Sequence, residues 1–119
     1  MLVVQIWIAS LENSFTKEIG KKPTKNELKS NAKTQVILWE NVDLEKRSIL
    51  KNTIDRIFGS LPIETSDLSP ELDSNYNEIE GAYHQYQIYE STKSKVELSF
   101  RYFKSKPDLM DVQLYLTTK

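Results

Sequence analysis

Hydrophobic residues in the first part of the chain recur every three or four positions, which is the spacing of one helix face. Between residues 2 and 19 the positions on this face are Val4, Ile8, Leu11, Phe15 and Ile19. Gly20 follows, where a helix commonly ends. We therefore predict a first helix over residues 2–19, although its opening LVVQIWI fits a strand equally well.

Two further runs also follow helical spacing. Thr24 and Glu27 have the spacing of a capping box, with Pro23 just before them. They predict a second helix, with these inward positions: Leu28, Ala32, Val36 and Trp39. Its closing QVILW could instead form a strand. A third helix is predicted over about residues 43–58, ended by Gly59.

After Gly59 the pattern changes from helical spacing to alternation. Residues 60–80 have no sustained period and read as a long connection. Three alternating runs follow, AYHQYQIYE, KVELSFRYF and LMDVQLYLT, linked by STKS and KSKPD. The predicted fold is a single α+β domain spanning residues 1–119. Two to three N-terminal helices, within residues 2–58, pack on one face of a three-stranded antiparallel β-meander at residues 82–118.

Alternation assigns one face of each strand to the core. The predicted inward residues are Ala82, Tyr86, Ile88, Val96, Leu98, Phe100, Tyr102, Met110, Val112, Leu114 and Leu116. The opposite face then carries aromatic residues and an arginine, types that are enriched at binding hot spots. We predict these residues as a partner site: Tyr83, Tyr89, Arg101, Phe103 and Tyr115. Alternatively, cross-strand aromatic pairs stabilise the sheet, or another segment covers this face.

The stretch DLSPELDSNYNEIEG, residues 67–81, holds five carboxylates and no Lys or Arg. From Asp73 it opens like a calcium-binding EF-hand loop. Positions six and twelve of such a loop require Gly and Glu, but here they are Glu78 and His84. We therefore predict no metal and no cofactor. Glu71 and Asp73 are predicted to attract a partner with a basic surface, and the alternative is a solvated loop.

Charge and composition reduce the number of possible functions further. Residues 1–59 carry a net charge of +3 and residues 60–119 carry −4. Lysines outnumber arginines thirteen to three, which disfavours specific reading of nucleic acid. The chain has no cysteine, so thiolate chemistry is excluded. The apolar N-terminus lacks the preceding basic residues of a signal peptide and is too short to cross a bilayer, so we predict a soluble cytoplasmic protein.

No phosphate-binding glycine loop or serine nucleophile motif occurs, and the one histidine, His84, is predicted to be structural. The predicted function is a non-enzymatic protein-binding domain of the inhibitor, antitoxin, immunity or adaptor type. One alternative is a small-ligand-binding or enzymatic α+β protein with His84, Tyr86 and Tyr102 facing a cavity. A second alternative is binding of single-stranded RNA on the sheet.

Overall fold

The computed structural model describes residues 2–29 and 33–118, with side chains from residue 9 onward. It contains two α-helices, a short 3-10 helix and seven strands. Their bounds are α1 Leu2–Ile19, β1 Lys25–Leu28, β2 Thr34–Asp43, η2 Leu44–Lys46, α2 Arg47–Phe58, β3 Glu64–Thr65, β4 Ser69–Leu72, β5 Glu78–Glu90, β6 Ser94–Phe103 and β7 Lys106–Thr118.

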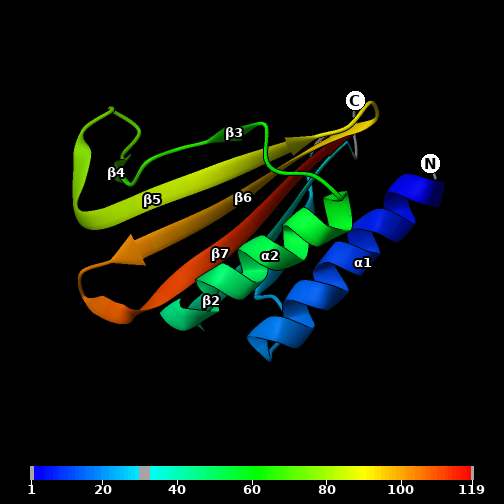
Figure 1. The fold of residues 1–119 in the computed structure, drawn as a ribbon. Helices are drawn as coiled ribbons and strands as arrows, with labels where there is room; N and C mark the ends of the chain where they lie inside the picture. The colour runs from blue at the N-terminus through cyan, green and yellow to red at the C-terminus, as the bar shows by residue number, and fades with distance from the viewer. Residues whose placement is uncertain (1, 30–32, 119) are drawn as a thin grey trace.

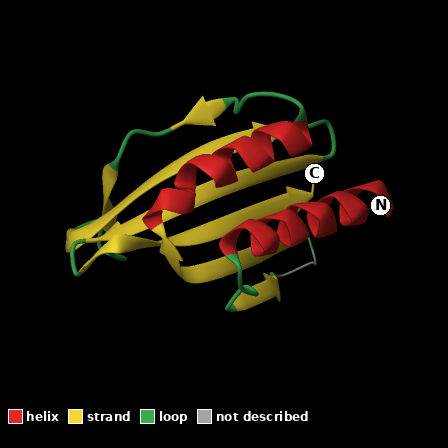
Figure 2. Cartoon of the chain, turned by 60° about the horizontal axis from the view of Figure 1, so that its bottom comes forward, coloured by secondary structure: helices red, strands yellow, loops and turns green. Residues whose placement is uncertain are grey.

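The strands form one antiparallel sheet in the order β1-β2-β7-β6-β5-β3, with β4 also paired to β5. Both α-helices lie side by side on the same face of this sheet (Figures 1 and 2). None of the described helices combines the length and the apolar character needed to cross a membrane. The chain therefore has a two-layer architecture, with helices on one side and an open sheet face on the other.

The predicted architecture is wrong, although the α+β class stands. The sheet has seven strands rather than three, and the predicted helix after Pro23 is the β1–β2 hairpin. Thr24 does not cap a helix, because its backbone N–H and its hydroxyl both donate to the Leu38 carbonyl. Ala32, assigned to that helix, lies outside the described residues. The predicted connection contains β3 and β4, and β7 begins at Lys106, inside the predicted KSKPD link.

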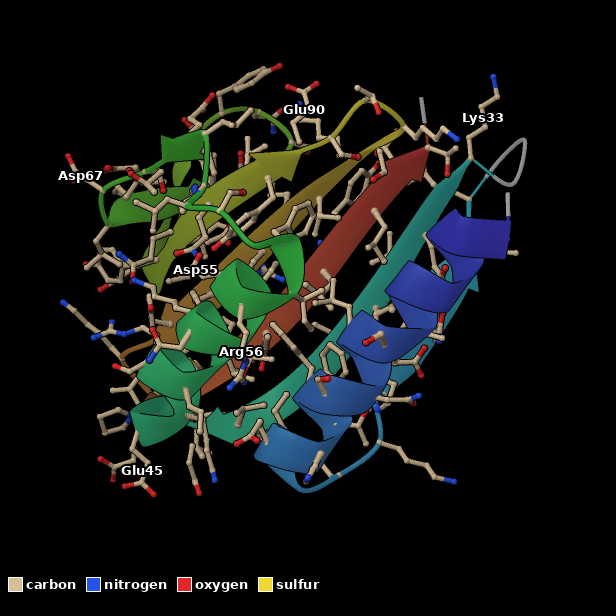
Figure 3. All side chains as sticks on the ribbon, turned by 45° about the vertical axis from the view of Figure 1, so that its right-hand side comes forward. Lys33, Glu45, Asp55, Arg56, Asp67 and Glu90 are labelled. Atoms are coloured by element: carbon tan, nitrogen blue, oxygen red, sulfur yellow. The ribbon has the colours of Figure 1, made fainter. Side chains whose placement is uncertain are left out.

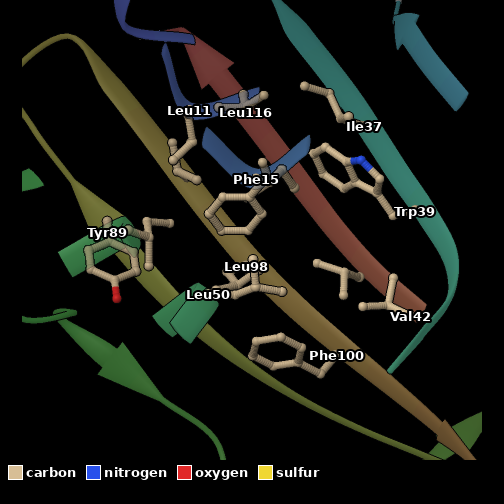
Figure 4. Close-up of a cluster of buried hydrophobic side chains, with 14 of the residues drawn as sticks. Leu11, Phe15, Ile37, Trp39, Val42, Leu50, Tyr89, Leu98, Phe100 and Leu116 are labelled. Carbon is tan, nitrogen blue, oxygen red and sulfur yellow. The ribbon is translucent and has the colours of Figure 1, made fainter. Parts of the chain in front are cut away.

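The core fills the space between the helices and the sheet (Figure 4). Leu11 and Phe15 of α1 are fully buried, as are Leu50 and Ile54 of α2. The Phe15 ring lies 5.7 Å from the ring of Trp39 on β2, measured between centroids. The predicted positions Val4 and Ile8 have side chains outside the described residues. The predicted first helix is thus confirmed as α1. The predicted third helix is α2, but it begins at Arg47 and not near residue 43, where β2 ends. Each helix is held by an apolar stripe.

Gly59 ends α2 in the left-handed conformation, with φ +69°, and its N–H donates to the Asp55 carbonyl. An added Cβ would meet nothing within 4 Å, so substitution costs backbone strain alone. We expect Gly59→Ala to lower the free energy of unfolding by about 1–2 kcal/mol, measured by urea denaturation. Gly59→Asn should cost less, because asparagine tolerates this conformation. Equal stabilities for all three proteins would contradict this account.

The predicted facing of β5 is wrong. Tyr89 pairs with the core residue Val96, and Gln87 pairs with the core residue Leu98. Directly opposed residues share a face, so Tyr83, Gln85, Gln87 and Tyr89 of β5 face the helices, whereas Tyr86 lies on the other face. Ala82 and Ile88 are buried as predicted, but on the other face. Polar groups on the helix side find partners there, since the Tyr89 hydroxyl donates to Asp55 and accepts from Gln87. Asp55 belongs to α2 (Figure 3).

Candidate functional site

The open face, defined here by the residues of β5, β6 and β7 that point away from the helices, consists of three rows across the sheet. Strand register aligns them as Ile88–Glu97–Tyr115, Tyr86–Ser99–Gln113 and His84–Arg101–Asp111. Phe103 follows Arg101 on the same side, with its ring centroid 5.9 Å from the guanidinium carbon. The face therefore mixes aromatic, charged and amide groups, as partner surfaces commonly do.

A depression of about 480 Å³ lies on the open face, lined mainly by residues of β5 and β6 and by Glu71 of β4. Arg101 of β6 contacts Glu71, because Arg101 Nε donates a hydrogen bond to Glu71 Oε1 at 2.9 Å. His84 Nδ1 lies 3.7 Å from the same oxygen and is buried, with no hydrogen-bond partner among the residues that the structure describes. The Arg101 side chain is 39 % exposed, so this contact orients Arg101 more than it stabilises the fold.

Tyr86 forms the second polar contact of the depression. Its hydroxyl donates to Glu64 Oε2 of β3 at 2.8 Å. This hydrogen bond and the charge of Glu64, with a smaller contribution from Glu97, raise the pKa of Tyr86 above its ordinary value. Ser99 donates its hydroxyl to Glu97 at 3.0 Å. The hydroxyl groups of the depression thus donate to carboxylates, and neither is hydrogen-bonded to His84.

The structure divides the predicted partner residues between the two faces. Arg101, Phe103 and Tyr115 lie on the open face. Tyr115 is 41 % exposed to solvent. Tyr83 pairs with Tyr102, which packs against the core, so it faces the helix side. Tyr89 is 1 % exposed and its ring stacks on Phe58, with 4.8 Å between centroids. It cannot contact a partner while the domain is folded.

The two acidic candidates both have contacts within the chain. Glu71 binds Arg101, as described above. Asp73 organises the turn between β4 and β5, where its Oδ1 accepts from the N–H groups of Asn75 at 2.8 Å and Asn77 at 3.0 Å. The segment that resembles an EF-hand is therefore a hairpin turn. Among the described residues no group of three or more His, Cys, Asp or Glu side chains is placed to hold a metal ion.

The residues of the predicted cavity do not converge. His84 and Tyr86 line the depression on the open face. Tyr102 lies on the helix side, where its hydroxyl donates to Gln85 Oε1 at 2.6 Å and accepts from Arg47 at 3.2 Å. Burial raises the pKa of Tyr102 above its ordinary value. Since the sheet separates these side chains, they do not face one shared pocket.

Sequence reasoning singled out the acidic stretch at residues 67–81, but it did not show that residues 61–80 form one edge of the sheet, which we call the acidic edge. It runs along β5, because Glu64 of β3 pairs with Ile88 and Ser69 of β4 pairs with His84. Residues 60–90 contain seven carboxylates and no Lys or Arg, a signal that was readable from sequence. Its exposed apolar residues were not readable, because exposure depends on which strands pair.

Comparisons with protein-family models, with curated proteins and with solved structures gave no match. Function is therefore argued from the surfaces of this chain alone.

Proposed function

We propose that this chain is a non-enzymatic, cytoplasmic protein-binding domain of the inhibitor, antitoxin, immunity or adaptor type, and that its partner binds the open face. One observation carries the proposal. Both helices lie on the opposite side of the sheet (Figure 2), so no helix covers the aromatic and charged side chains of the open face or its depression. An antiparallel sheet face that only meets water is usually polar, whereas this one carries Tyr86, Phe103 and Tyr115.

Arg101 is the central residue of this proposed site. Glu71 fixes its guanidinium group from one side, and the Phe103 ring lies near it on another. A pre-oriented arginine loses little side-chain entropy on binding, and its planar group suits carboxylates and aromatic rings of a partner. The arrangement favours binding over catalysis. The Ser99 hydroxyl is hydrogen-bonded to Glu97, so the depression has no nucleophile–base pair with His84.

Alanine substitution of open-face residues tests the proposal. We expect Tyr115→Ala and Phe103→Ala each to weaken partner binding about thirtyfold, the effect of losing a 2 kcal/mol hot spot. A partner captured from extracts of the source cells would be purified, and its dissociation constant measured by calorimetry. The unfolding free energy of Tyr115→Ala should change by less than about 1 kcal/mol, because its side chain is largely exposed.

Leu28→Ala is the matched control, because Leu28 is an exposed apolar residue on β1, 66 % accessible, and lies off the open face. It should leave binding unchanged. Wild-type affinity in both open-face variants would refute the open face as the binding site.

A further inference from the structure

Exposed apolar side chains are concentrated on the acidic edge. Among the described residues nine large hydrophobic side chains are exposed, and six of them belong to this segment. The six are Leu61, Ile63, Leu68, Leu72, Tyr76 and Ile79. Single exposed apolar residues are ordinary on a protein surface, but a contiguous group usually marks an interaction site. The open face does not account for this group, because the segment that carries it runs along the outer side of β5 (Figure 1).

The same edge carries an unbalanced negative charge. Six of its twenty residues are Asp or Glu, and none is Lys or Arg. Glu71 and Asp73 have partners within the chain, but the carboxylates of Asp67, Glu78 and Glu80 have neither a hydrogen bond nor an ion pair among the described residues. Asp67 points away from the molecule (Figure 3). These free carboxylates would repel nucleic acid and attract a basic surface.

Tyr76 occupies the tip of the β4–β5 turn. Its side chain is 84 % exposed and its backbone has φ +62°, a conformation that non-glycine residues rarely adopt. Its N–H donates to the Asp73 carbonyl at 3.0 Å, which holds the turn in place. A glycine would fit this backbone with less strain, so the large ring is not present for the sake of the turn.

We propose that the acidic edge binds a protein segment in which Lys or Arg side chains alternate with large apolar ones. The inference rests on the proposed function and adds the chemistry of the partner. Carboxylates alone would suit any polycation, but the exposed Leu, Ile and Tyr residues require apolar groups in the bound segment as well. Burial of those groups would slow dissociation, while the carboxylates would speed association at low salt.

A second copy of this chain is the obvious competing occupant, because residues 17–33 hold six lysines. Several of these lysines already have partners within their own chain. Lys21 donates to the backbone carbonyls of Glu40 and Asn41, and Lys29 lies 3.5 Å from Glu27. Self-association through this basic segment would cost those contacts, so the charge pattern favours a different protein.

The test uses short random peptides displayed on phage and selected on the immobilised chain. Selected peptides are expected to be enriched in Lys or Arg together with large apolar residues. Synthetic copies should shift the amide NMR signals of residues 61–80. Their affinity should fall about tenfold or more in the triple variant Asp67→Asn, Glu78→Gln and Glu80→Gln, whose substituted carboxylates have no partner within the described part of the chain.

The matched control removes the same charge elsewhere, through Glu40→Gln, Glu45→Gln and Asp108→Asn, and should change affinity by less than about twofold. Peptides without a basic and apolar bias would overturn the inference, as would equal losses in both triple variants. Concentration-dependent dimerisation in sedimentation that the edge variant abolishes would make a second copy the occupant and also overturn it. If binding fails only in Tyr115→Ala, the proposed function stands and this inference falls.

Discussion

Tyr89→Ala is expected to lower the free energy of unfolding by about 3–5 kcal/mol, the cost of deleting a large buried aromatic side chain. Tyr89 is 1 % exposed and stacks on Phe58 at the end of α2. Its hydroxyl also joins Asp55 of α2 to Gln87 of β5. The substitution removes the ring packing and both hydrogen bonds together. Urea denaturation at neutral pH measures the loss, and a change below about 1 kcal/mol would place Tyr89 outside the core.

Tyr89→Phe separates the hydroxyl from the ring. It should cost about 1–3 kcal/mol, because Asp55 and Gln87 lose their shared partner in a partly buried position. Burial, followed by the hydrogen bond to Asp55, raises the pKa of Tyr89 well above its ordinary value near 10. Above about pH 10 the unfolded chain therefore releases this proton while the folded chain retains it, and stability falls as pH rises. The fall should be shallower in Tyr89→Phe, and an identical slope would contradict this assignment.

Trp39→Ala is expected to have a similarly large effect, about 3–5 kcal/mol, and to act mainly on α1. Trp39 is fully buried and its ring contacts Phe15, which anchors α1 to β2. Hydrogen exchange should show that the amides of α1 lose more protection than those of α2, because Trp39 forms the surface on which α1 packs. Equal loss of protection in the two helices would contradict this role.

Trp39→Phe is the control for packing. Among the described residues the indole Nε1 is buried without a hydrogen-bond partner, so phenylalanine removes this donor while keeping an aromatic ring. Its cost should be well below that of alanine. The double variant Phe15→Ala and Trp39→Ala should lose less than the sum of the single variants, since the two rings contact each other.

The elements with clean periodicity were predictable from the sequence. The apolar stripes of α1 and α2 repeat at helical spacing, and β6 and β7 alternate strictly between core and solvent. That alternation correctly placed Arg101, Phe103 and Tyr115 on the face opposite the core. The β2 segment was ambiguous because Val36 and Ile37 are both buried on adjacent positions. A strand with apolar residues on both faces reads as a continuous apolar run, which fits a helix equally well.

The rest of the candidate site depended on contacts between distant parts of the chain. On β5 the core-facing positions include Gln85 and Gln87. Gln85 Oε1 accepts a hydrogen bond from Tyr102, and Gln87 Nε2 donates one to Tyr89. Because the core-facing side of β5 carries these polar residues, the opposite side resembled a core face in the sequence. The predicted inward and outward faces of β5 were therefore exchanged. The contact between Glu71 and Arg101 requires β4 to pair with β5, and no local pattern near Ser69–Leu72 predicts that pairing.

The interrupted outer strand of the sheet also bears on solubility. An exposed strand with free backbone groups can template the addition of another chain and so begin a fibril. Here β3 is two residues long, β4 begins four residues later, and Pro70 within β4 has no N–H to offer. The surrounding carboxylates repel an approaching edge of the same kind. This edge of the sheet therefore offers few free backbone groups to another strand, despite the exposed leucines and isoleucines beside it.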